Sequence, residues 1–396
     1  MISGQSISNS LGPLELLVIQ PTPFCNIDCS YCYLPHRQST NRMSLDVLEQ
    51  TFRWVFDSGL VREPFTLLWH AGEPLVVPIE FYRQAVDLLD KHNDLNHQVD
   101  HAFQTNATLI TKEWCEFILE HDIKMGVSVD GPPFLHDRYR RTRQGKGTFE
   151  SAMRGVELLR EHNIGFYVIS VITGDTLDYP DELFDFYLSH EMTNVAFNME
   201  EIEGPNTKTS LQGRGMEKRF RRFLERFVEL SRSIDPPLRL REFENPAGAI
   251  MEGRFAPGMR TQENKPWGIL SVDHAGNFST YSPELLGIES SKYGRFVLGN
   301  VATDSLEDVM ASEKFQLLER DIAEGVRQCQ ETCEYFPFCG GGPPGNKYFE
   351  NGTFACTETL SCRLDKKMCV DVALEFLERQ PCQSSCSANS SPMPSE

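Results

Sequence analysis

The sequence has no long apolar run, and its first residues lack a basic start followed by an apolar core. A membrane-spanning helix needs about 20 consecutive apolar residues, so we expect none, and we expect no secretion signal. Positive charge is also scarce, because 38 Lys and Arg residues face 57 Asp and Glu residues, for a net charge of −19. This balance argues against nucleic acid or an anionic membrane as the main partner. We therefore expect a cytoplasmic protein with no nucleic acid and no membrane among its partners.

The twelve cysteines are unevenly distributed along the chain. Three of them are Cys25, Cys29 and Cys32, Cys115 stands alone, and the other eight fall between residues 329 and 386. In a reducing compartment such clusters indicate metal or redox chemistry rather than a disulfide framework. Cys115 lies in an amphipathic pattern, so we expect it in the core.

The first 200 residues alternate strand patterns with helix patterns. The segment 44–59, for example, has apolar residues at helical spacing, with Ser44 as the expected N-cap. Alternation of this kind predicts βα units, and six units are fewer than the eight of a complete TIM barrel. The expected fold class is α/β, with a partial (β/α)6 TIM-like barrel at residues 10–240. Short apolar runs, typical of strands buried on both faces, occur at 14–20, 65–72, 101–106, 124–131, 165–173 and 194–200.

The composition changes beyond this region. A polar loop at 204–215 precedes one long amphipathic helix, and after residue 260 the alternation gives way to glycine-rich turns and cysteines. We therefore expect a second, Cys-rich domain at residues 255–375. The polar segment 376–396 is typical of a disordered tail.

Cys25, Cys29 and Cys32 follow directly on the first predicted strand, at the sheet edge where α/β barrels place their active sites. The spacing C-x3-C-x2-C allows one short loop to supply three thiolates to a [4Fe–4S] cluster and leaves the fourth iron open. An open coordination position is typical of a catalytic metal centre. A zinc site completed by a ligand from elsewhere is the alternative.

This spacing, with an aromatic residue before the last cysteine, resembles the radical S-adenosylmethionine (radical SAM) superfamily. The resemblance implies that the open iron binds S-adenosyl-L-methionine (AdoMet) and that reductive cleavage yields a 5′-deoxyadenosyl radical. Later strands end in segments that also resemble the superfamily: HAGEP, QTNAT and SVDGP. The AdoMet-contacting residues expected from them are Gly72, Glu73, Asn106, Ser128 and Asp130. In the basic segment 136–149, Arg138 and Arg141 have two interpretations, contact with AdoMet or substrate and a solvated loop.

The segment 329–367 resembles the SPASM extension of radical SAM enzymes that modify peptides and proteins. Cys329, Cys333, Cys339 and Cys362 match ligand positions of that pattern, whereas two further positions are occupied by Tyr281 and Pro343. We therefore expect one auxiliary [4Fe–4S] cluster, held by those four cysteines, and no second one. Two alternatives stay open: Cys356 in place of Cys362, and a structural zinc ion in place of the cluster.

Within this group, the C-terminal motifs resemble maturases of ribosomally made peptides that form three-residue cyclophanes. This implies a precursor peptide as the substrate, a reductant such as flavodoxin or ferredoxin, and a C–C bond between an aromatic ring and the Cβ of a nearby residue. The catalytic base is unknown, with Glu284 as a candidate and a plain surface carboxylate as its other interpretation. Leader recognition is expected at the rim around 200–215 or in a separate protein.

Two other functions remain open from the sequence. An anaerobic sulfatase-maturating enzyme shares the architecture and would oxidise Cys or Ser to formylglycine, but the missing first auxiliary cluster disfavours it. A non-catalytic iron–sulfur or zinc-binding protein would not need the open iron that Cys25, Cys29 and Cys32 imply.

Overall fold

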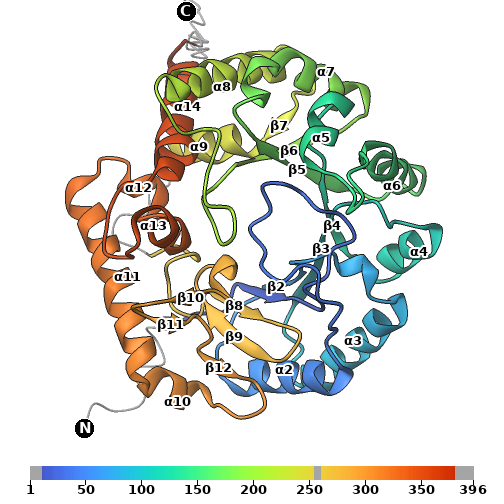
Figure 1. The fold of residues 1–396 in the computed structure, drawn as a ribbon, viewed down its shortest axis with the longest axis vertical. Helices are drawn as coiled ribbons and strands as arrows, with labels where there is room; N and C mark the ends of the chain where they lie inside the picture. Colours follow the sequence, from blue (N-terminus) through green and yellow to red (C-terminus); the bar gives the residue numbers. More distant parts are fainter. Residues whose placement is uncertain (1–10, 254–259, 380–396) are drawn as a thin grey trace, which may run out of the picture.

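The computed structural model describes residues 11–253 and 260–379. Its centre is a sheet with the strand order β12-β9-β8-β1-β2-β3-β4-β5-β6-β7 (Figure 1). The six strands predicted from the sequence are confirmed, and they pair in parallel in chain order. They are β1 (Leu16–Ile19), β2 (Phe65–Trp69), β3 (Val99–Thr105), β4 (Lys124–Ser128), β5 (Phe166–Ile172) and β6 (Asn194–Met199).

Further strands extend this sheet at both ends. On one side the short β7 (Arg239–Leu240) pairs in parallel with β6. On the other side β8 (Ile269–Val272) pairs in parallel with β1, followed by the antiparallel β9 (Asn277–Thr280) and β12 (Gly299–Asn300). A separate two-stranded sheet joins β10 (Glu289–Ser290) to β11 (Gly294–Arg295). The Cys-rich part of the chain therefore contributes strands to the barrel sheet, on the side opposite β7.

Helices cover the outer face of the parallel strands (Figure 1). Ser44 is confirmed as the N-cap of α2, since its hydroxyl accepts a hydrogen bond from Val47 N. No helix in the described ranges is both long and apolar enough to cross a bilayer. The helices that cover the barrel are α2 (Leu45–Asp57), α3 (Ile79–His92), α4 (Lys112–Glu120), α5 (Pro133–Tyr139), α6 (Phe149–Glu161), α7 (Pro180–Ser189) and α8 (Met216–Arg232).

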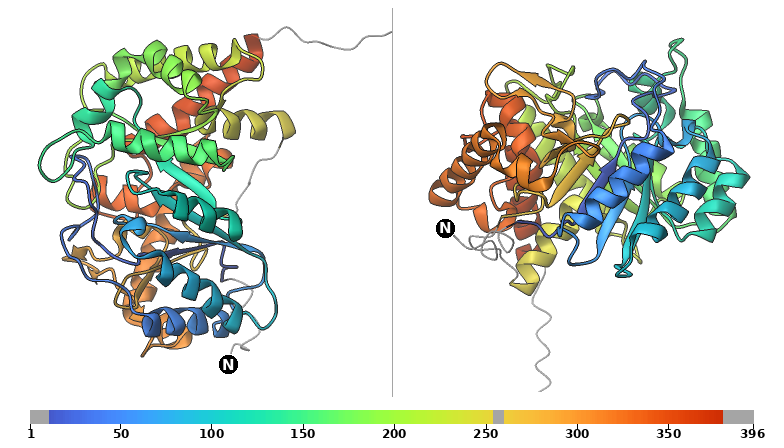
Figure 2. Two further views of the ribbon diagram at one scale, coloured as in Figure 1. Left: turned by 90° about the vertical axis from the view of Figure 1, so that its right-hand side faces the viewer. Right: turned by 90° about the horizontal axis from the view of Figure 1, so that it is seen from below.

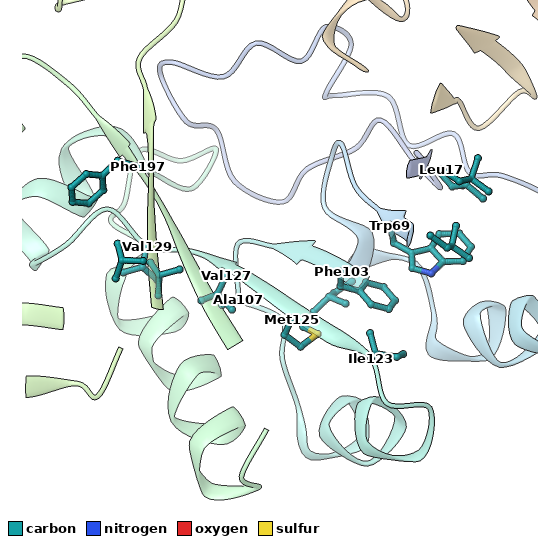
Figure 3. Close-up of a cluster of buried hydrophobic side chains, with 14 of the residues drawn as sticks. Leu17, Trp69, Phe103, Ala107, Ile123, Met125, Val127, Val129 and Phe197 are labelled. Atoms are coloured by element: carbon teal, nitrogen blue, oxygen red, sulfur yellow. The ribbon is translucent and has the colours of Figure 1, made fainter. Parts of the chain in front are cut away.

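Buried hydrophobic side chains, Trp69 and Phe103 among them, fill the space between strands and helices (Figure 3). Trp69 of β2 stacks on Phe103 of β3 at 6.3 Å between ring centroids, and Tyr82 of α3 meets both rings edge-on at 5.0 and 4.9 Å. Cys115 of α4 is fully buried, as predicted for a core residue. Close packing of large rings holds the strands in fixed positions, so the loops at their carboxyl ends start from a rigid frame.

The C-terminal part packs along one side of the barrel (Figure 2). Phe315 of α11 stacks on Trp267 just before β8, at 5.5 Å between centroids, while α14 packs on α9 beside β6 and β7. This part therefore spans the gap between the two ends of the sheet. Its helices are α9 (Arg241–Glu252), α10 (Leu306–Ala311), α11 (Glu313–Thr332), α12 (Phe336–Cys339), α13 (Pro344–Asn351), a π-helical turn (Cys362–Lys367) and α14 (Met368–Arg379).

The end of the chain differs in part from the sequence prediction. Because α14 continues to Arg379, the first residues of the segment predicted as a disordered tail are helical. The periodic apolar residues of α14 pack on α9, which explains why the helix extends into that segment. The rest of the predicted tail, with Cys382 and Cys386, lies outside the described residues.

Candidate functional site

The loop between β1 and α2 brings Cys25, Cys29 and Cys32 together. None of them forms a disulfide, and the charges of Cys29 and Cys32 each raise the pKa of Cys25, so the three thiols lie close together. Burial is the main cause that raises the pKa of Cys25 and Cys29 to about 12. Such thiols are neutral by themselves, whereas coordination to a metal centre deprotonates them. The donor set and its enclosure therefore fit an iron–sulfur cluster.

Gly72 allows the segment after β2 to approach this cysteine loop. Its φ is +73°, and a Cβ at this position would lie 2.4 Å from the carbonyl oxygen of Thr22 and 2.8 Å from that of Phe24. The next residue, Glu73, donates its backbone N–H to Phe24 O at 2.8 Å. The backbone at Gly72, a residue expected to contact AdoMet, thus lies directly against the cysteine loop.

The Glu73 carboxylate joins the ends of β2 and β3. It is 1% exposed and accepts hydrogen bonds from Leu75 N at 3.0 Å, Thr105 Oγ1 at 2.7 Å and Asn106 N at 2.8 Å. Burial raises its pKa to about 7 in spite of these bonds. This carboxylate, predicted to contact AdoMet, thus has most of its hydrogen bonds with the segment after β3 and with Leu75.

Asn106 connects that segment to the cysteine loop. Its side-chain amide donates to Asn26 Oδ1 at 2.9 Å and lies 3.7 Å from Cys25 Sγ. Amide contacts to a ligand sulfur are one of the means by which proteins tune iron–sulfur clusters. The structure therefore places Asn106 beside the predicted cluster.

Asp130, after β4, forms a buried ion pair with Arg140. The guanidinium donates to both carboxylate oxygens, at 2.9 and 3.1 Å, and these oxygens also accept from Tyr31 OH and from Val171 N. Arg140 Nη1 lies 3.9 Å from Cys29 Sγ, and its charge lowers the pKa of that thiol against the larger effect of burial. Asp130 thus contacts the cysteine loop directly at Tyr31 and acts on Cys29 through Arg140, a residue that the sequence analysis did not select.

The basic segment after α5 also contacts the loop, through a different arginine than expected. Arg143 donates to the carbonyl of Cys25 at 2.7 and 3.1 Å and lies over the Phe24 ring at 5.0 Å. Arg138 pairs with Asp175 at 2.9 Å, and Arg141 donates to a backbone carbonyl. Four arginines with the same charge lie between residues 138 and 143, so only the fold identifies Arg140 and Arg143.

Ser128 and its neighbours leave one buried acceptor without a donor. Gln104 donates its amide to Ser128 Oγ at 3.0 Å, while its Oε1 has no hydrogen-bond partner within the described part of the chain. Gly126 provides the room, since a Cβ there would lie 2.2 Å from this Oε1. This unpaired acceptor at the carboxyl ends of β3 and β4 fits a ligand that carries amino or hydroxyl donors, as AdoMet does.

The four cysteines predicted as auxiliary ligands line a single cavity of about 350 Å³. Cys356 does not line it, and its Sγ lies 3.3 Å from both Asn351 Nδ2 and Thr353 O. Within residues 11–253 and 260–379, no three His, Cys, Asp or Glu side chains converge on a single metal ion. A zinc ion needs its ligands around one point, whereas a cubane separates them over its irons. The arrangement favours a cluster held by Cys329, Cys333, Cys339 and Cys362.

Where the seven-cysteine SPASM pattern would place another ligand, Tyr281 occupies an apolar environment. Its ring is fully buried and packs with Leu285 and Phe354, and its hydroxyl donates to Glu319. The chain therefore supplies no thiolate at this position, where a buried tyrosine ring packs instead.

A larger cavity, of about 650 Å³, lies against the auxiliary one, and five residues line both: Cys339, Pro343, Asn346, Ser361 and Lys366. Six carboxyl groups line it: Glu201, Glu203, Glu242, Glu263, Glu284 and Asp365. Burial raises the pKa of Glu201 and Glu284 to about 7 and also raises that of Glu203, with Glu201 adding to the effect. Groups that titrate near neutral pH suit proton transfer, and this position of Glu284 inside the cavity agrees with its proposed role as a base.

Comparisons with known proteins agree with these features. Residues 19–187 match the family described as the radical SAM superfamily. An uncharacterized protein of Synechocystis sp. is 45% identical, over 93% of this chain and 93% of that protein. A serine-type anaerobic sulfatase-maturating enzyme of Bacteroides thetaiotaomicron is 26% identical, over 85% of this chain and 84% of that enzyme.

Two solved structures share the fold. A structure of anSMEcpe with bound AdoMet and a peptide superposes with a TM-score of 0.75 at 22% identity, covering 92% of this chain and 98% of that one. Streptococcus suis SuiB bound to the precursor peptide SuiA superposes with a TM-score of 0.62 at 16% identity, covering 90% and 77%. The superfamily binds a [4Fe–4S] cluster and AdoMet. The chain belongs to the same family as the Synechocystis protein and is a radical SAM enzyme.

Proposed function

We propose that this enzyme modifies a ribosomally made precursor peptide by joining an aromatic ring carbon to the Cβ of a nearby residue. The product is a cyclophane, and the substrate loses two hydrogens in total. One leaves the Cβ as a hydrogen atom, and the ring loses the second as an electron and a proton after the C–C bond has formed. A flavodoxin or ferredoxin in a reducing cytoplasm would supply electrons for AdoMet cleavage.

In this proposal Cys25, Cys29 and Cys32 hold the cluster that binds AdoMet. When bound, the cluster and AdoMet supply the 5′-deoxyadenosyl radical that removes the Cβ hydrogen. Gly72 and Glu73 fix the loop against β2 and β3, as their contacts with Phe24 and Asn106 indicate. The AdoMet contacts fall to groups that remain available at the strand ends, with the orphaned Gln104 Oε1 beside Ser128 as the first candidate acceptor.

The observation that carries the proposal is the pair of adjoining cavities. The larger one has a volume of about 650 Å³, and Cys339 lines both it and the auxiliary cavity. A substrate ring placed there would lie beside a redox-active group, as the loss of one electron from the ring requires. Glu284 lines the same cavity, and its pKa of about 7 allows it to accept the ring proton near neutral pH.

Oxidation of a Ser or Cys residue to formylglycine is the second candidate, supported by the likeness to a sulfatase-maturating enzyme over most of the chain. The two functions share the first hydrogen abstraction and differ in the fate of the resulting carbon radical. We favour crosslinking because the described residues provide one auxiliary thiol set, with Tyr281 buried where the seven-cysteine pattern would continue.

The test is anaerobic co-expression of the full chain with the short reading frames encoded beside its gene, followed by mass spectrometry of the peptides. A crosslink removes two hydrogens and blocks fragmentation within a short aromatic segment. Serine oxidation removes the same two hydrogens, so a carbonyl-trapping reagent is needed to separate the products. A trapped aldehyde would replace the crosslinking proposal with the formylglycine one.

The matched control is a variant with Cys25, Cys29 and Cys32 all changed to Ala, which must leave the peptides unmodified. If the unaltered enzyme cleaves AdoMet but modifies no neighbouring peptide, the precursor assignment is wrong. If a correctly loaded enzyme does not cleave AdoMet, Cys25, Cys29 and Cys32 do not have the role proposed here.

A further inference from the structure

Three lysines line the cavity formed by the four auxiliary cysteines. Lys366 pairs with Asp365 at 2.9 Å, and Lys367 pairs with Glu358 at the cavity edge. Lys347 differs from both, because no carboxylate within the described ranges forms an ion pair with it. The cavity therefore contains one lysine whose charge is not balanced by a protein carboxylate.

Lys347 reaches the cavity from α13 and is 4% exposed. Its Nζ lies 3.1 Å from the carbonyl oxygen of Gly325 and 3.4 Å from Cys329 Sγ, one helical turn further along α11. Gly325 itself is held tightly, since a Cβ there would meet Phe354 O at 2.1 Å. The ammonium group is thus directed at the sulfur of a predicted ligand by a rigid part of the structure.

A buried ammonium group is unfavourable unless an anion compensates it. The carbonyl of Gly325 supplies a hydrogen bond but no charge. The remaining hydrogen-bond partner is Cys329, which is anionic only when it is a thiolate. Four thiolates around a [4Fe–4S] core carry a net negative charge, which increases by one on reduction. A fixed cation at 3.4 Å from one of these sulfurs therefore stabilises the reduced form more than the oxidised form.

We propose that Lys347 is a positioning residue that raises the reduction potential of the auxiliary cluster through its positive charge at Cys329 Sγ. The use of this effect rests on the proposed function, because a cluster with a higher reduction potential accepts an electron from a substrate ring more readily. The electrostatic effect itself depends only on the auxiliary ligand set. The two claims can therefore fail independently.

The experiment is a redox titration of the full-length chain followed by electron paramagnetic resonance. Changing Cys25, Cys29 and Cys32 to Ala removes the other cluster, so the remaining signal reports the auxiliary one. In this background Lys347→Met removes the charge and keeps the side-chain length, and Lys347→Gln removes the charge and keeps an N–H donor. Lys367→Met is the matched control, because Lys367 lines the same cavity and is paired with Glu358.

We expect Lys347→Met and Lys347→Gln both to shift the reduced-to-oxidised ratio at least tenfold toward the oxidised form, a downward shift of about 59 mV or more for one electron. The control is expected to shift less than half as far. An unchanged potential in a cluster-loaded Lys347→Met variant would overturn the proposal. If only the Lys347→Gln variant binds a cluster, the reduction potential of that cluster decides the question. A potential equal to that of the protein with Lys347 would show that hydrogen bonding, and not charge, sets it, and would overturn the proposal. No peptide substrate enters the titration, so a failure of the crosslinking assay leaves its outcome unaffected.

Discussion

The contact between Gly72 and the cysteine loop gives the sharpest prediction, and the perturbation is Gly72→Ala. An alanine at φ +73° costs about 1–2 kcal/mol for the left-handed backbone alone. The new Cβ would also lie 2.4 Å from Thr22 O and 2.8 Å from Phe24 O, which are backbone atoms that cannot rotate away. Overpacking of this kind adds about 1–3 kcal/mol, so we expect the free energy of unfolding to fall by about 2–5 kcal/mol in total.

Gly59→Ala is the matched control, because Gly59 also has a positive φ, +69°, but nothing lies within 4 Å of its would-be Cβ. Gly59→Ala should lose only the stability that the left-handed backbone costs, about 1–2 kcal/mol. Urea unfolding of both variants measures the difference, and iron content after anaerobic reconstitution measures the effect on the loop. Gly72→Ala should lose the iron attributed to Cys25, Cys29 and Cys32, whereas Gly59→Ala should keep it. Equal stability and equal iron in the two variants would refute the assigned contact.

Other parts of the molecule give four further predictions. Cys362→Ser should remove the auxiliary cluster's iron and Cys356→Ser should not; the reverse result in an iron assay would identify Cys356 as the ligand. Glu284→Gln should retain 5′-deoxyadenosine formation but reduce crosslinked product by about 10²–10⁴-fold. In the unaltered enzyme the crosslinking rate should rise with pH through about 7, because the carboxyl must be deprotonated to act. An equal yield of crosslinked product from the variant would exclude Glu284 as the base. Burial raises the pKa of Glu203 above its ordinary value of 4.5, so the stability that its protonated form contributes is lost as the pH rises. Glu203→Gln should therefore be more stable than the unaltered chain at about pH 8 and differ little from it at about pH 5. Thermal unfolding at the two pH values measures this difference. Arg140→Met should cost about 3–5 kcal/mol in urea unfolding, because it leaves Asp130 buried without its cation, and the double change with Asp130→Asn should recover part of that loss.

Much of the barrel was predictable from the sequence, because its information is local. A run such as 166–172 is apolar and β-branched whatever surrounds it, and the six predicted strands are all present in the sheet. The cysteine loop was visible for the same reason, since three thiols within eight residues lie close together in any fold. The strand β8 was missed because four residues carry too little periodicity, and its place beside β1 depends on pairing across the whole chain.

The sequence by itself determined the chemistry that this chain can carry: the cysteine spacing, the acidic balance and the alternation of strands and helices. Only the tertiary structure decided which residues of a given type act together. It placed the side chains of Arg140 and Arg143 on the cysteine loop, while the side chains of Arg138 and Arg141 in the same segment contact other groups. It likewise directed Lys347, among the three cavity lysines, at a ligand sulfur. The physical reason is that charge and hydrogen bonding act over a few ångströms, and residues far apart in the sequence come within that range only when the chain is folded.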